Sequence, residues 1–335
     1  MFKWKKASIS LLVFIMAIFM LVGCNSNTNG KAEETSGGKK SDKIVVGFSQ
    51  IGAESGWRTA ETKSIKETLG NNPDFELKFS DAQQKQENQI KAIRNFIAQK
   101  VDVIALAPVV ETGWESILQK AKDAKIPVIL LDRGIKVKDE SLYTSFIGSD
   151  FILEGENAAK ELIKLIGEDQ KANIVELQGT VGASAANDRK TGFANVLKDH
   201  PNFNIIKSQS GDFTRTKGKE VMEAFLKSDG KDIDAVYAHN DDMAIGAIQA
   251  IEEYGLKPGE DIKVVSIDGI KDAFEAAAQG KTNIIVECNP LLGPQLAQAV
   301  KDLKAGKEIP RWIKTEESVF VGKDAAEEAL PSRKY

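Results

Sequence analysis

The sequence predicts an α/β fold with two domains, each built on a doubly wound parallel sheet. From Lys43 onward, short apolar runs alternate with amphipathic helical patterns. Near-continuous apolar runs are typical of strands that helices cover on both faces of a parallel sheet. The pattern restarts after Gly148-Ser149-Asp150. The chain beyond residue 42, roughly 290 residues, therefore predicts two similar domains rather than one.

The first half supplies three strand patterns and two helical patterns before this restart. The apolar runs predict strands over 44–48, 101–106 and 126–131. Ile90, Ile93, Phe96 and Ile97 share one face of a helix over roughly 84–99, and a second helix follows around 114–121. Each run is short enough for a strand, and each helical pattern is long enough for a crossover between parallel strands.

The second half repeats this order with more units. Strands are predicted over 173–177, 205–206, 233–237, 262–267 and 284–286, and helices over about 184–198, 215–227, 241–254 and 272–279. Repeated β-α units imply right-handed crossovers and a Rossmann-like sheet in each domain. No glycine-rich phosphate-binding motif follows any of the predicted strands. The segment 47–52 comes nearest, but it has too few glycines and the wrong spacing between them. A nucleotide-binding function is therefore rejected.

The N-terminus predicts secretion and a lipid anchor. Lys3, Lys5 and Lys6 precede an uncharged apolar stretch that ends in Leu21-Val22-Gly23-Cys24. This order predicts a signal peptide over 1–23, with Cys24 as the lipidated first residue of the mature protein on the extracellular face of the membrane. An ordinary transmembrane anchor is the alternative, but the apolar run is marginally short for a bilayer. Residues 24–42 are almost entirely polar and predict a flexible linker.

Charge and cysteine content exclude several classes of function. Without the three leader lysines the chain has 42 basic and 49 acidic residues, a net charge of −7. This balance argues against nucleic acid and anionic lipid head groups as main partners. Cys24 and Cys288 are the only cysteines, so lipidation of the first leaves no internal disulfide, and Cys288 is interpreted as a small buried residue. With two histidines, we expect no metal site, and we expect no cofactor.

Polar and aromatic residues follow strand after strand in both halves. In open α/β sheets, ligands bind beyond the carboxyl ends of the strands. The candidate ligand-binding residues at these ends are Gln50, Trp57, Arg58, Asp132, Arg133, Arg189, Phe213, Asn240, Asp268 and Glu287. Their recurrence at one end of each predicted sheet predicts a binding site between the two domains.

The chemistry of this set favours a neutral sugar. Three arginines offer forked donors and three carboxylates offer acceptors, whereas a phosphate or dicarboxylate would require a surplus of donors. A metal would require converging carboxylates without guanidinium groups. Gln50 and Asn240 both donate and accept, and Trp57 and Phe213 offer flat faces for the C–H side of a ring. A polyol uses all of these groups.

Structural roles are the alternative for several of these residues. Asn240 or Asp241 could cap the helix that follows. The neighbours Asp132-Arg133 and Asp188-Arg189 could be ion pairs near the surface. Trp57 could be the first core residue of a helix. His239 alone indicates no catalytic function.

Six stretches of the chain resemble a known family. They are FSQIGAESGWRTAE (48–61), QQKQENQIKAIRNFIAQKVD (83–102), LLDRGI (130–135), VELQGTVGASAANDRKTGF (175–193), SQSGDFTRTKGKEVME (208–223) and YAHNDDMAIGAIQAI (237–251). With them, the chain from about Ile44 to Ile313 resembles the sugar-binding proteins of bacterial ABC importers. These form the periplasmic-binding-protein group of ribose and galactose binders, and the galactofuranose binders are the most similar among them.

The resemblance implies a periplasmic-binding-protein type I fold with three connecting strands between the lobes, near 149–150, 286–287 and 311–314. The expected N-terminal lobe is 43–150 plus 288–312, and the C-terminal lobe is 151–287 plus 313–335. It also implies sugar contacts at Trp57, Arg58, Asp132, Arg133, Arg189, Phe213, Asn240, Asp268 and Glu287.

The implied function is capture of a monosaccharide, galactofuranose- or galactose-like, by a monomeric binding protein that delivers it to an ABC permease without catalysis. A sugar receptor for a chemotaxis protein or a sensor kinase shares the same site. A glycoside-processing enzyme is less favoured, because an arginine near each carboxylate is expected to lower its pKa.

Overall fold

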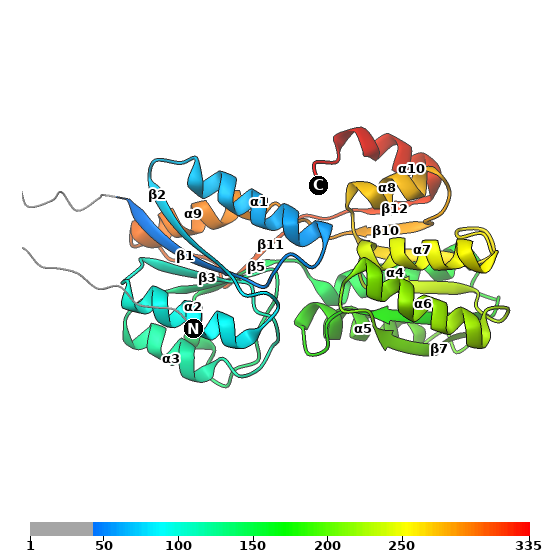
Figure 1. Ribbon diagram of the computed structural model, residues 1–335, viewed down its shortest axis with the longest axis horizontal. Coiled ribbons are helices and arrows are strands. Elements are labelled where there is room, and N and C mark those ends of the chain that lie inside the picture. Colours follow the sequence, from blue (N-terminus) through cyan, green and yellow to red (C-terminus); the bar gives the residue numbers. More distant parts are fainter. Residues whose placement is uncertain (1–42) are drawn as a thin grey trace, which may run out of the picture. The chain divides into compact units, whose positions relative to one another are not determined.

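The computed structural model describes residues 43–335, and the predicted signal peptide, Cys24 and linker lie outside the described residues. Residues from Asp42 to Tyr335 form one compact unit. This unit contains two six-stranded sheets, and each sheet has its own helices (Figure 1). Among residues 43–335, no helix combines the length and the apolar character needed to cross a bilayer.

The first lobe is built on a fully parallel sheet with the strand order β11-β5-β4-β3-β1-β2. Its strands are β1 (Ile44–Gln50), β2 (Phe75–Asp81), β3 (Val103–Leu106), β4 (Val128–Leu131), β5 (Ser145–Gly148) and β11 (Trp312–Lys314). Its helices are α1 (Gly56–Gly70), α2 (Gln86–Ala98), α3 (Glu115–Asp123), α9 (Gly293–Lys304) and the short 3₁₀ helix η1 (Glu140–Leu142).

The second lobe repeats this arrangement with the order β12-β10-β9-β8-β6-β7, in which only the pairing of β12 with β10 is antiparallel. Its strands are β6 (Ala172–Gln178), β7 (Phe203–Ser210), β8 (Ala235–Ala238), β9 (Lys263–Asp268), β10 (Ile284–Glu287) and β12 (Val319–Val321). Its helices are α4 (Phe151–Ile166), α5 (Ser184–Leu197), α6 (Arg215–Asp229), α7 (Asp241–Tyr254), α8 (Lys271–Ala278), α10 (Gly322–Ala329) and the 3₁₀ helix η2 (Leu330–Ser332).

The chain passes between the two sheets three times. It leaves the first sheet after β5, returns after β10 and crosses again between β11 and β12. Ile313 and Lys314, which the sequence analysis placed in the second lobe, pair with β5 of the first sheet. The third crossing therefore lies within residues 315–318.

The hydrophobic core shows why the buried strands are recognisable in the sequence. Alternate residues of β1 point to opposite faces, with Val46 and Phe48 in one cluster and Val45 in the other. One cluster is covered by α1 and α9, and the other by α2 and α3. Both faces are dry, so β1 has the continuous apolar run of a doubly covered strand.

The predicted helices and strands are present with shifts of one or a few residues at their ends. β2 and β12 are less apparent in the sequence because both are edge strands with partly exposed residues. β11 and β12 have only three residues each, too few for a periodic pattern.

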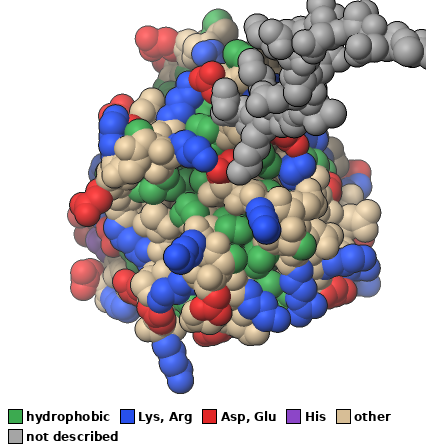
Figure 2. Space-filling model, turned by 90° about the vertical axis from the view of Figure 1, so that its left-hand side faces the viewer, with side chains coloured by type: hydrophobic (Ala, Val, Ile, Leu, Met, Phe, Trp, Pro, Cys, Tyr) green, Lys and Arg blue, Asp and Glu red, His purple; other side chains and the backbone are tan. Residues whose placement is uncertain are grey.

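Charges of both signs occur on the end of the first lobe. Where no grey atoms cover it, Figure 2 shows Lys and Arg interspersed with Asp and Glu around exposed hydrophobic side chains.

Candidate functional site

A small cavity lies between the carboxyl ends of the strands of both lobes. It is lined by Glu54, Ser55, Trp57, Arg58, Asp132, Arg133, Ala185, Arg189, Phe213, Asn240, Asp268 and Cys288. Its volume is about 20 Å³, far below the several hundred Å³ of typical small-molecule pockets. A monosaccharide can enter only if the lining side chains or the lobes move apart.

Eight of the ten predicted site residues line this cavity, whereas Gln50 and Glu287 do not. Gln50 ends β1, but its side-chain Nε2 donates to Glu61 Oε2 and Thr62 Oγ1, both at 2.9 Å, on the buried face of α1. Successive residues of a strand point to opposite faces, so the residue at a strand end is not necessarily directed at the ligand.

Glu287 holds the C-terminal segment instead of facing the cavity. Its Oε1 accepts hydrogen bonds from Arg333 Nη1 at 2.7 Å and Tyr335 Oη at 3.2 Å, and its Oε2 accepts one from Ser318 N. The side chain therefore joins β10 to the end of the chain.

Arg58 is the centre of an ion-pair network in the first lobe. Ser55 caps α1 by accepting a hydrogen bond from Arg58 N at 3.1 Å, which fixes the start of the helix. The guanidinium then donates to Glu54 at 3.0 Å, Glu61 at 2.5 Å and Asp132 at 2.5 Å. Burial opposes the charge of Arg58, yet these carboxylates raise its pKa well above the usual value.

The two glutamates of this network respond differently. Burial would raise the pKa of Glu54, but the nearby Arg58 and Arg133 outweigh it, so the pKa is lowered. For Glu61, burial outweighs the attraction of Arg58, so the pKa is raised. Glu54 therefore presents an ionised carboxylate at the cavity wall, and its Oε2 has no hydrogen-bond partner among the described residues.

Arg133 has fewer partners than Arg58. Its Nη1 donates to Val109 O at 3.2 Å, and its other charged neighbours, Glu54 and Asp132, lie at 3.6 and 3.7 Å. Burial and the charge of Arg58 lower the pKa of Arg133 to about 10. Its Nε has no hydrogen-bond partner in the described part of the chain. A polar ligand could accept from this group.

Arg189 plays the corresponding role in the second lobe. It donates to Glu154 at 2.7 Å and His239 O at 2.6 Å, and Asp268 Oδ1 lies at 3.5 Å. The expectation that an arginine would lower the pKa of each carboxylate is wrong for Asp268. Burial outweighs Arg189 and raises the pKa of Asp268 well above its usual value.

Two aromatic rings complete the wall. Trp57 is buried, and its Nε1 donates to Cys288 O at 2.6 Å, so it links α1 to the segment after β10. Phe213 packs directly on Gly179, where a Cβ would lie 1.9 Å from the ring. The Arg133 guanidinium lies 5.0 Å from the centre of the Phe213 ring. These rings offer the flat faces that the sequence analysis assigned to them.

Three of the eight non-glycine residues with positive φ among residues 43–335 line the cavity. Asp132, Phe213 and Asp268 have φ values of 58°, 62° and 131°, a region that residues with a side chain rarely adopt. Such strain persists only where the surrounding structure enforces it, and it is common at ligand sites. Asp132 comes from the first lobe and Phe213 and Asp268 come from the second, so strained residues of both lobes meet at this cavity, which supports a binding role.

The structural alternatives considered for the site residues have mixed outcomes. Asn240 does cap α7, with Oδ1 accepting from Met243 N, and it also lines the cavity. Asp241 instead accepts from Gly269 N and Ile270 N at the start of α8. The pair Asp132-Arg133 is buried rather than near the surface.

Four lining residues were not predicted: Glu54, Ser55, Ala185 and Cys288. Glu54 lies in the loop before Ser55, the residue that caps α1, so no helical spacing marks it in the sequence. Cys288 follows Glu287 directly, so the strand-end rule located the position but favoured the wrong neighbour.

Comparison with known proteins shows the family to which the chain belongs. A family model described as "Periplasmic binding protein domain" matches residues 46–308. The chain belongs to the periplasmic binding protein family. The galactofuranose-binding protein YtfQ of Escherichia coli K12 is 53% identical over 296 residues, which are 87% of this chain and 92% of that protein. The family is one of binding proteins, in agreement with the prediction that the chain is not an enzyme.

Two solved structures share the fold of this periplasmic binding protein. The binding component of the arabinose ABC transporter from Shewanella sp. ANA-3, bound to α- and β-L-arabinofuranose, has a TM-score of 0.83 and 50% identity, covering 87% of this chain and 95% of that chain. A Mycobacterium smegmatis protein in complex with β-D-fucofuranose has a TM-score of 0.84 and 52% identity with the same coverage. The two parallel-sheet lobes are therefore of the periplasmic-binding-protein type I fold.

Proposed function

We propose that this protein captures a monosaccharide in its furanose form between the two lobes and delivers it to the permease of an ABC importer. The main support for this proposal is that side chains from the strand ends of both lobes line one cavity. These side chains include arginines, carboxylates and two aromatic rings. Each sugar hydroxyl both donates and accepts, so this balanced set can satisfy several of them.

The names of three relatives support a five-membered ring. One is a galactofuranose-binding protein, and two structures contain arabinofuranose or fucofuranose. The cavity favours small polar ligands because its polar groups are buried. A hydroxyl of the wrong stereochemistry leaves such a group unpaired, at about 1–3 kcal/mol.

Closure of the lobes completes the proposed mechanism. A sugar that contacts Arg58 and Arg133 in one lobe and Arg189 and Asp268 in the other stabilises the closed arrangement, because only that arrangement completes its hydrogen bonds. We propose that the protein acts as a monomer and that the closed form docks on the permease. Isolation of a permease rather than a sensor kinase with the sugar-loaded protein would separate this function from that of a receptor.

Calorimetry of the purified full-length protein tests the ligand. The panel is a galactofuranoside, arabinose, galactose, ribose and glucose. We expect one-to-one binding of one furanose-forming sugar, lost in Arg133→Ala and Asp268→Ala. Arg94→Ala is the matched control, because Arg94 is exposed on α2. No heat with any sugar would contradict the proposal.

We propose that Cys24 is lipidated and holds the protein at the extracellular face of the membrane. Cells fed a labelled fatty acid should label the wild-type protein and Cys288→Ser, but not Cys24→Ser. Labelling that persists in Cys24→Ser would contradict the anchor.

A further inference from the structure

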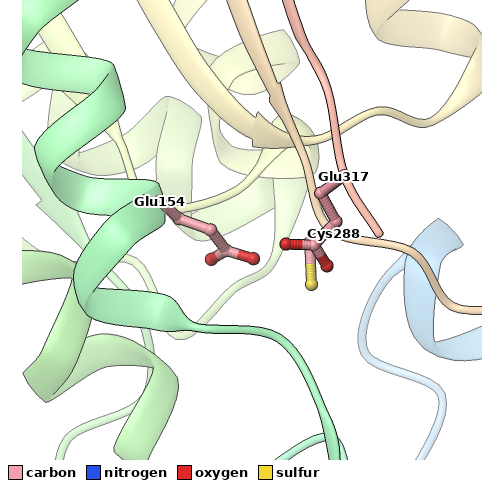
Figure 3. A group of neighbouring side chains, drawn as sticks. All are labelled: Glu154, Cys288 and Glu317. Carbon is pink, nitrogen blue, oxygen red and sulfur yellow. The ribbon is translucent and has the colours of Figure 1, made fainter. Parts of the chain in front are cut away.

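Three acidic side chains meet beside the sugar cavity, where the chain passes between the lobes. They are Glu154 near the start of α4, Cys288 after β10 and Glu317 between β11 and β12. One potential ligand atom from each lies within 4.8 Å of the others. Glu154 follows the first crossing of the chain, Cys288 follows β10 at the second, and Glu317 lies within the third. Figure 3 shows the Glu154 carboxylate directed toward the other two side chains.

Glu154 has an unsatisfied oxygen at this point. Its side chain is 2% exposed, and Oε2 accepts from Arg189 Nε at 2.7 Å. The other oxygen, Oε1, is buried without a hydrogen-bond partner among residues 43–335. Within this cluster, the Cys288 side chain interacts with the Glu154 carboxyl. Because buried polar atoms are nearly always satisfied, the unpartnered Oε1 is open to a further ligand.

The other two side chains are held in place by neighbours. Ser149 Oγ lies 3.3 Å from Cys288 Sγ and also contacts Glu317 Oε1. Glu317 Oε1 accepts further hydrogen bonds from Thr315 Oγ1 at 2.7 Å and Asn289 N at 3.2 Å. Such outer contacts orient the ligands of metal sites.

We propose that Glu154, Cys288 and Glu317 bind a divalent cation of the zinc class. One thiolate and two carboxylates are ligands that zinc accepts, and three protein ligands leave a fourth position for water. The thiolate argues against magnesium and calcium, which take oxygen ligands. The three anions carry three negative charges and Arg189 one positive charge, so a dication balances the cluster.

The geometry requires only a small adjustment. Zinc with ligands at about 2.0–2.3 Å in a tetrahedron brings them roughly 3.5 Å apart. The ligand atoms now lie within 4.8 Å of one another, so their separations shorten by up to about 1.3 Å. Metal binding releases two protons to solvent, one from the Cys288 thiol and one from the Glu154 carboxyl, whose pKa burial raises to about 8. The expectation of no metal site was based on the scarcity of histidine, which this site does not use.

The bound cation would link the chain segments at all three crossings. This proposal goes beyond sugar binding and does not depend on it, because zinc can be measured on the protein without any sugar.

Equilibrium dialysis of the full-length protein against zinc tests the site. We expect one zinc per chain in the wild type. Loss of a residue that only orients a metal ligand weakens metal binding 10–100-fold. Cys288 and Glu317 are proposed to bind the metal directly, so Cys288→Ser and Glu317→Gln should each weaken zinc binding by at least about tenfold. Glu316→Gln, an exposed neighbour of Glu317, is the matched control and should bind as the wild type does. Cys24→Ser should also retain zinc.

Cobalt(II) gives a second readout, because thiolate coordination produces a charge-transfer band in the near ultraviolet. The band should be present in the wild type and Glu316→Gln and absent in Cys288→Ser. If Cys288→Ser does not fold, zinc binding by Glu317→Gln decides whether the site exists. Glu317 is only half-buried, so its substitution should leave the fold intact. Failure of the wild type to retain zinc, or unchanged binding in Glu317→Gln, would overturn the proposal.

Discussion

Arg133 and Phe213 come from different lobes, yet the guanidinium lies over the ring, and Gly179 packs closely against the same ring. At the scale of single residues, the site therefore depends on the tight packing of the Phe213 ring. Gly179 is required because any Cβ there would overlap the Phe213 ring.

Replacing Gly179 should therefore damage the site. In Gly179→Ala, the added methyl group pushes the Phe213 ring toward the cavity, at about 1–3 kcal/mol of strain. We expect sugar affinity to fall by about tenfold or more in calorimetry. Gly70→Ala is the control, since a Cβ at Gly70 meets nothing within 4 Å. Equal affinity of both variants would contradict this reading of Phe213.

His239 supplies a pH prediction at the same scale. Burial lowers the pKa of His239, even though its Nε2 lies 3.1 Å from Glu176 Oε1. The pKa of Glu176 is also lowered: burial alone would raise it, but hydrogen bonds to the Glu176 carboxylate and the charge of His239 outweigh burial. Both native pKa values lie below those of the unfolded chain, so the unfolded state takes up more protons as the pH falls. Stability present above pH ~6.5 is therefore lost progressively below it.

Urea unfolding at pH 7.5 and pH 5 measures this loss. His239→Gln, which cannot be protonated in this range, should lose less stability between the two values than the wild type. His200→Gln alters the chain's other histidine and should behave as the wild type does. If His239→Gln loses as much unfolding free energy between pH 7.5 and pH 5 as the wild type does, other groups cause the acid sensitivity.

At the scale of elements, paired glycines bring neighbouring helices of the second lobe together. A Cβ on Gly192 of α5 would lie 2.0 Å from Ile152 O of α4, and one on Gly155 of α4 would lie 2.2 Å from Arg189 O of α5. This contact sets the distance between the helices that carry Glu154 and Arg189, so it positions the site.

Separating these helices should weaken both folding and binding. Gly192→Ala forces α5 away from α4, and we expect the free energy of unfolding to fall by about 1–3 kcal/mol. Sugar affinity should fall as well, because Arg189 moves with α5. In Gly70→Ala the new Cβ meets nothing within 4 Å, so its stability should change by less than about 1 kcal/mol. Denaturant titration and calorimetry give the two values.

The elements also show what the sequence could reveal. Continuous apolar runs predicted the central strands, because both faces of each sheet are dry. The rule of strand ends located most of the cavity wall, since parallel strands end at one edge. It failed for Gln50 and Glu287 because the rule gives a position along the strand and not the direction of the side chain. Glu54 lies in a loop, where no periodicity applies.

At the scale of the whole molecule, several hydrogen bonds join the lobes outside the sugar cavity. Gly56 N donates to Asp242 Oδ2 at 2.7 Å, Glu111 N to Gly182 O at 2.9 Å, Gly134 N to Ser184 Oγ at 2.9 Å and Asn187 Nδ2 to Glu111 Oε2 at 2.6 Å. In the proposed mechanism, these contacts hold the lobes closed and break when a sugar enters or leaves.

Removing one of them should shift the lobes toward opening. In Asn187→Ala the closed arrangement loses the hydrogen bond to Glu111, and we expect sugar affinity to fall by about two- to tenfold. Small-angle scattering without sugar should give a larger radius of gyration. Asn195→Ala, on the same helix, removes only an exposed contact with Lys198 and is the matched control. A wild-type affinity for Asn187→Ala would contradict the role of this contact.

Three of these four contacts use a backbone N–H of the first lobe as the donor, at Gly56, Glu111 and Gly134. Substitution of a side chain leaves a main-chain donor in place unless proline is introduced. Mutations that reshape the cavity for a different ligand can therefore accumulate without removing these donors. Evolution, or a designer of biosensors, could change what such a protein recognises while retaining how it closes.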